Sequence, residues 1–196
     1  GLVTGLLGLS AALSFALGCV VIFRNSSKRT HRLFAMLSAN LFLWAIGVLM
    51  IVTSRDENAA RFWIKTTFVV ASFLPATFYH FIVYFPHQRF DGFRSILLAL
   101  YAGGLVQVAG TLFTPWYLHS VAIQPGLPPL VTYGPIFYGY SFWVLLSMLF
   151  SFSNLIGKRG RATGVERRQV EHVLIGIFLC TTFATVTNVV APAMDV

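Results

Sequence analysis

Residues 33–53, LFAMLSANLFLWAIGVLMIVT, form an apolar run without a charged side chain and set the class of fold. At 1.5 Å of rise per residue, such a run makes a helix of about 30 Å, the thickness of the hydrocarbon core of a bilayer. Residues 2–23, LVTGLLGLSAALSFALGCVVIF, have the same character. Because hydrocarbon offers no partner for backbone amides, both runs are expected to be transmembrane helices.

Four further runs of similar length follow, and the six predicted spans are residues 2–23, 33–53, 62–85, 96–114, 135–156 and 170–190. None shows the ten-residue alternation of a membrane β-strand. The sequence therefore predicts an all-α, polytopic helix bundle that forms a single domain over residues 1–196. Six spans return the chain to the side on which it starts, so we expect a further helix to follow.

The composition excludes an ordinary soluble domain. The chain is 57% hydrophobic and only 10% charged, with a mean hydropathy of +0.76. The net charge of +8 lies in the connectors, where it sets orientation and attracts the lipid bilayer, so nucleic acid is not an expected partner. The cysteines, Cys19 and Cys180, lie inside apolar runs without metal-ligand spacing, and no metal site is predicted.

Basic residues divide unevenly between the two sides of the predicted bundle. The first, third and fifth connectors hold 11 of the 14 Lys and Arg residues: Arg24, Lys28, Arg29, Arg32, Arg89, Arg94, Lys158, Arg159, Arg161, Arg167 and Arg168. The opposite side holds Arg55, Arg61 and Lys65. Cytoplasmic loops carry the excess of positive charge, so the N-terminus is expected on the side of the membrane that faces away from the cytoplasm.

Two connectors have a distinct composition. Residues 115–134 contain no charged side chain but several prolines and aromatic residues, which predicts an extended loop at the membrane interface or a lid over a ligand. Residues 157–164, GKRGRATG, lack the ending of a phosphate-binding loop and are expected to form a flexible basic connector.

Polar side chains within the spans are the candidates for a ligand site, because each costs free energy in lipid unless it faces the bundle or a wet cavity. The deepest are Asn40, His80, Gln107 and Asn188. No Asp, Glu, Lys or Arg occupies the middle of a span, which argues against an ion-coupled transporter. No catalytic constellation can be assembled, so we expect no enzyme within these residues.

The third span contains a candidate hinge. Pro75 lacks a backbone N–H and should kink the helix, and His80 lies between this kink and the end of the span. His80 is either a polar latch or a packing histidine bonded to a neighbouring hydroxyl. With His172 it could also ligate a haem or chlorin axially, but two histidines without supporting spacing do not predict such a cofactor, which stays unknown.

Three stretches resemble one family when taken together: residues 25–44 with their basic start, HFIVYFP at 80–86, and ERRQ at 166–169 leading into VLIG at 173–176. They are similar to the seven-helix N-terminal sensor region of bacterial histidine kinases and related signalling proteins. This resemblance implies a sensory input module whose partner is a cytoplasmic domain, often a kinase. The alternatives are an accessory structural subunit of a larger multi-subunit membrane complex and a small-molecule carrier. A further membrane protein, or a second copy of the chain in a homodimer, is a possible partner.

The division of basic residues yields a topology prediction. A single cysteine at Asn58 should react with an impermeant thiol reagent added to intact cells, and one at Gly160 should not. Labelling of a cysteine at Gly160 in intact cells would show that the predicted orientation is wrong.

An Arg placed on the lipid face in the middle of the sixth span should cost about 3 kcal/mol of insertion free energy.

Overall fold

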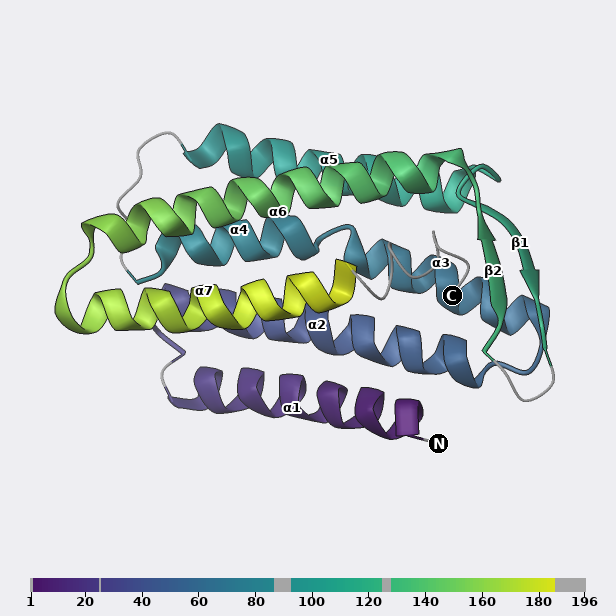
Figure 1. The fold of residues 1–196 in the computed structure, drawn as a ribbon, viewed down its shortest axis with the longest axis horizontal. Coiled ribbons are helices and arrows are strands. Elements are labelled where there is room, and N and C mark those ends of the chain that lie inside the picture. The colour runs from purple at the N-terminus through teal and green to yellow at the C-terminus, as the bar shows by residue number, and fades with distance from the viewer. Residues whose placement is uncertain (1, 25, 87–92, 125–127, 186–196) are drawn as a thin grey trace. The chain divides into compact units, whose positions relative to one another are not determined.

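The computed structural model describes residues 2–24, 26–86, 93–124 and 128–185 and is mostly helical (Figure 1). Its elements in chain order are α1 (Leu2–Arg24), α2 (Arg29–Thr53), α3 (Glu57–Ala71), α4 (Leu74–Tyr84), α5 (Phe93–Phe113), β1 (Leu118–Ala122), β2 (Leu130–Tyr133), α6 (Pro135–Arg161) and α7 (Gly164–Thr185). Contacts divide the chain into two compact units, Gly1–Val144 and Leu145–Val196, with the boundary inside α6.

The helices confirm the predicted membrane-spanning fold. Within the described residues, five helices are long and apolar enough to cross a bilayer, and α3 and α4 together count as one of them, Glu57–Tyr84. The described part of the sixth predicted span lies in α7, while residues 186–190 of that span fall outside the described residues. The chain is therefore a multi-pass, all-α membrane protein.

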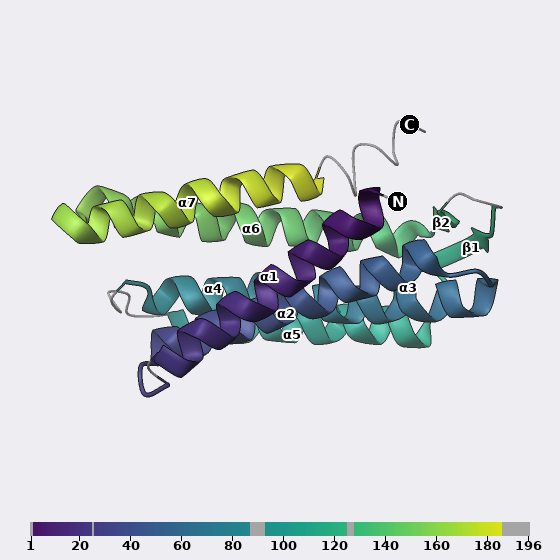
Figure 2. The same cartoon turned by 90° about the horizontal axis from the view of Figure 1, so that it is seen from below.

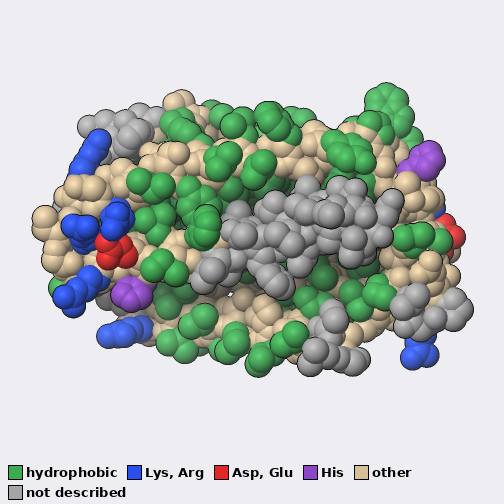
Figure 3. All heavy atoms as spheres, in the orientation of Figure 1, with side chains coloured by type: hydrophobic (Ala, Val, Ile, Leu, Met, Phe, Trp, Pro, Cys, Tyr) green, Lys and Arg blue, Asp and Glu red, His purple; other side chains and the backbone are tan. Residues whose placement is uncertain are grey.

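The first unit is built around the α3–α4 segment. Of the residues in its most apolar window, 61% are buried, whereas no other candidate span exceeds 22%. Both α2 and α5 pack against it, and α1 lies obliquely against α2 (Figure 2). The other helices expose many large apolar side chains, as expected for lipid-facing surfaces, and Figure 3 shows Lys and Arg gathered near helix ends.

The central segment is broken at the position where the sequence predicts a kink. α3 ends at Ala71 and α4 begins at Leu74, with Pro75 in its first turn. Since proline has no N–H, the helical bond to the residue four positions earlier is lost. Local hydrogen bonds flank the break: the Ser72 hydroxyl donates to the Phe68 carbonyl oxygen at 2.8 Å at the end of α3, and the Thr77 amide donates to the Phe73 carbonyl oxygen at 2.9 Å at the start of α4.

The loop over residues 115–134 contains a hairpin that the sequence analysis did not anticipate. Strands β1 and β2 pair antiparallel with an irregularity between Leu118 and Ser120. Leu118 and Val121 are buried and pack against Ala60 and Ile64 near the start of α3. The buried residues of β1 are three apart rather than two because the pairing is irregular between Leu118 and Ser120, so Leu118 and Val121 both face the helix while the rest of the strand is exposed.

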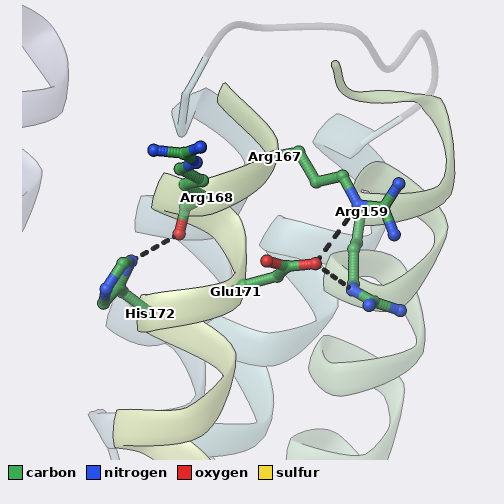
Figure 4. A network of polar contacts seen from close by, with 5 residues as sticks. All are labelled: Arg159, Arg167, Arg168, Glu171 and His172. Carbon is green, nitrogen blue, oxygen red and sulfur yellow. Dashed lines mark hydrogen bonds and ion pairs between the residues drawn. The ribbon is translucent and has the colours of Figure 1, made fainter. Parts of the chain in front are cut away.

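In the second unit, the expected flexible connector at 157–164 is largely helical, so this expectation was wrong. α6 continues to Arg161, and α7 begins at Gly164, whose positive φ of +57° suits glycine. Figure 4 shows a contact between the two helices: Glu171 of α7 accepts from Arg159 of α6 at 2.9 Å, and within α7 it also accepts from Arg167 at 3.2 Å. Basic side chains in the last turn of α6 also favour continuation of that helix.

Helix α5 approaches the break in the central segment most closely at Gly104. A Cβ atom added there would lie 2.9 Å from the Ser72 carbonyl oxygen and 3.2 Å from the Phe73 ring. The first neighbour is backbone, which cannot rotate away as a side chain can. Glycine at this position therefore lets α5 pack directly on the broken segment.

We expect Gly104→Ala to destabilise the protein by about 1–3 kcal/mol, because the added methyl group must displace backbone at the break. Gly110→Ala on the same helix is the matched control, since its Cβ would meet only Ile136 at an ordinary 3.8 Å. Thermal unfolding in detergent compares the two. Equal stability of both variants would mean that α5 does not pack on the break.

Candidate functional site

Five aromatic rings, here called the aromatic cluster, lie at the last turn of α3, beside the break in the central segment: Phe68, Tyr117, Tyr133, Phe137 and Tyr140. The Phe68 ring is at the centre, with its centroid 4.7 Å from that of Tyr117 and 5.5 Å from that of Tyr140 in edge-to-face geometry. Tyr133 and Phe137 stack on each other at 4.0 Å. The cluster thus joins the hairpin and the start of α6 to α3, one turn before the break.

Two phenols of this cluster lie outside the membrane spans in a dry environment. Burial raises the pKa of both Tyr117 and Tyr133, so both stay neutral at physiological pH. The Tyr117 hydroxyl is buried without a hydrogen-bond partner among the described residues. An unpaired buried hydroxyl costs about 1–3 kcal/mol, which marks this position as a place where a water or a polar ligand atom would be stabilising.

The Tyr84 end of the central segment borders a groove of about 310 Å³, here called the basic groove. Its lining residues come from the start of α2, the end of α4 and the start of α5: Arg29, His80, Tyr84, Phe93, Arg94, Leu97, Leu98 and Tyr101. The Arg29 guanidinium lies 4.0 Å above the Tyr84 ring, a cation–π contact. The Thr30 hydroxyl donates to the Tyr84 carbonyl oxygen at 3.3 Å, which ties α2 to the end of α4.

His80 contacts Tyr101 rather than the other predicted site residues. Its Nδ1 lies 3.2 Å from the Tyr101 hydroxyl. This is the kind of contact expected if His80 is a packing histidine bonded to a neighbouring hydroxyl. Its Nε2 is buried without a partner within the described residues, as is Oδ1 of Asn40. His80 therefore lines the basic groove with Nδ1 in a polar contact and with Nε2 lacking a partner among the described residues.

The predicted four-residue ligand site stays a prediction. Gln107 lies six residues beyond Tyr101 on α5, a rise of roughly 9 Å. Asn40 is equally far along α2 from Phe34, whose ring packs on Phe81 at 5.7 Å. No hydrogen bond joins Asn40, His80 and Gln107 among the described residues, and Asn188 lies outside them.

His172 belongs to the second unit, and its partner is its own helix. Its side chain is exposed, and Nδ1 donates to the Arg168 carbonyl oxygen at 2.6 Å (Figure 4). Across the described part of the chain, no three His, Cys, Asp or Glu side chains are grouped so as to hold a metal ion.

Sequence reasoning missed several residues that form the aromatic cluster and the basic groove. Phe68 looked like any lipid-facing phenylalanine, and Tyr101 had no motif around it. Arg29 and Arg94 entered only as topology signals. The aromatic richness of residues 115–134 was a usable signal for the cluster, but its partners on α3 and α6 depend on long-range packing.

The buried, broken segment and the lipid-facing helices around it define a polytopic helical membrane protein. The sequence matches, over residues 6–195, the family described as the N-terminal 7TM region of histidine kinase. The chain therefore belongs to this family, which confirms the resemblance drawn from the sequence. No curated protein and no solved structure matches it significantly.

The central position of Phe68 predicts that Phe68→Leu destabilises the first unit by about 2 kcal/mol or more, since several edge-to-face pairs of about 0.5–1.5 kcal/mol each are lost. Phe62→Leu on the same helix is the control, because Phe62 is 61% exposed. Thermal unfolding and limited proteolysis of the hairpin measure the effect. An unchanged hairpin in Phe68→Leu would show that the cluster does not anchor it.

Proposed function

We propose that this region is the sensory input module of a membrane-bound histidine kinase in the bacterial inner membrane, and that it carries no catalytic function itself. Family membership supports the role, and one structural observation carries the mechanism. A buried helical segment, interrupted at Ser72–Phe73, runs from the aromatic cluster to the basic groove.

The proposed mechanism is a shift between two packings of this segment. A ligand or membrane-state change at the aromatic cluster would favour one position of Phe68 over another. α3 would then move relative to α4 about the break, because a helix interruption absorbs backbone changes that a continuous helix resists. The movement would reach the Tyr84 end, where α2 and α5 meet α4, and pass to a cytoplasmic domain.

The unpaired Tyr117 hydroxyl favours the aromatic cluster as the sensing end. It sits beside the hairpin, on the side that the distribution of basic residues assigns to the exterior. An accessory subunit or a carrier would need neither a linked cytoplasmic output nor a break that responds to signal. Measurement of kinase output therefore distinguishes the sensor from both alternatives.

We expect Pro75→Ala to restore helical bonding across the break, straighten the segment and shift basal autophosphorylation of the full-length kinase at least severalfold, with expression near normal. Pro128→Ala is the control, because Pro128 is exposed in the hairpin loop outside any helix. Distances between spin labels on α3 and α4, with and without signal, test the movement. A segment that stays fixed while output changes would eliminate the hinge.

A further inference from the structure

The basic groove has an unbalanced charge. Arg29 and Arg94 are both exposed, and they stand in the first turns of α2 and α5. Of the described residues that line the groove, none is a carboxylate. Two helix N-termini add partial positive charge at the same end, so an anion in the groove would be attracted by side chains and backbone together.

The donors of the groove suit a phosphate group. Arg29 and Arg94 each present a planar fork that binds two phosphate oxygens at once, which a lysine cannot do. Tyr101 lines the same groove, and its hydroxyl can donate to a phosphate oxygen when Nδ1 of His80 is the donor in the contact between these two side chains. The stacking of Arg29 on Tyr84 holds one guanidinium at the groove rather than leaving it to sample solvent.

The remaining wall of the groove is apolar and open to lipid. Leu97 and Leu98 follow Arg94 along α5, and the Leu98 side chain is 71% exposed. The exposed apolar face continues along the same helix through Leu105 and Val106. A ligand that fits this combination has an anionic head and a hydrocarbon tail.

We propose that the basic groove binds the phosphate of an acidic phospholipid, with the headgroup between Arg29 and Arg94 and an acyl chain along Leu97 and Leu98. The distribution of basic residues places this end at the cytoplasmic leaflet. The proposal does not depend on the sensory mechanism, because lipid retention is measured without kinase output. The phosphate chemistry is shared with soluble phosphate esters, which the experiment treats separately.

The test is native mass spectrometry of the full-length protein in a non-ionic detergent, titrated with phosphatidylglycerol or phosphatidylcholine. A basic residue that lies against a bound anionic headgroup contributes about a fivefold gain in affinity, and of the four arginines exchanged in this test only Arg29 and Arg94 line the groove. We therefore expect Arg29→Gln with Arg94→Gln to weaken phosphatidylglycerol binding about 30-fold and to leave phosphatidylcholine binding unchanged. Arg161→Gln with Arg168→Gln, also exposed, is the matched control and should change it less than threefold.

Two further measurements test the proposal even if the double variant folds poorly. Leu98→Glu places a carboxylate at the exposed edge of the groove and should also reduce phosphatidylglycerol retention. In the wild type, glycerol phosphate should compete only weakly, because it lacks the acyl chain. Equal binding of both lipids, equal loss in the control variant, or full competition by glycerol phosphate would each overturn the assignment of a phospholipid to this groove.

Discussion

Every backbone amide inside a bilayer needs a partner within the protein, and the broken α3–α4 segment meets this constraint in an unusual way. A break exposes carbonyl and amide groups that lipid cannot satisfy. The first unit meets this need by burying the break and by pairing backbone groups on either side of it, through the hydroxyl of Ser72 and the amide of Thr77. Gly104 completes the arrangement by letting α5 cover the Ser72 carbonyl at close range. The packing of α2 and α5 around this segment follows from the need to enclose it.

The two contact points of the segment differ in kind. Beside the break, Phe68 is held by aromatic rings from the hairpin and α6, which are rigid and have few rotamers. At the end of α4, Tyr84 is held by the Arg29 guanidinium and the Thr30 hydroxyl of α2. In the proposed mechanism, a displacement at Phe68 would reach Tyr84 through the break, because neighbouring helices enclose the segment between them.

The sequence predicted the helices well because hydrocarbon thickness and missing backbone partners constrain them directly. It also located the interruption, since Pro75 acts through its own covalent structure. The hairpin was missed because its strands are short and gain stability from packing Leu118 and Val121 on α3. The helical extension of α6 to Arg161 was missed because it depends on Glu171, a partner in the next helix. Asn40, His80 and Gln107 could be ranked by depth, but depth alone does not say which side chains meet.

Energetic scale decides whether such a segment can act as a switch. Moving a two-state equilibrium from 1:99 to 99:1 takes about 5.5 kcal/mol of differential binding. Phe68 makes four edge-to-face contacts, with Tyr117, Tyr133, Phe137 and Tyr140, and at about 0.5–1.5 kcal/mol each these total a comparable amount. Satisfying the Tyr117 hydroxyl adds about 1–3 kcal/mol to whichever packing a ligand favours. The aromatic cluster therefore reaches the energy needed to bias the break only if nearly all of these contacts form in one packing and are lost in the other.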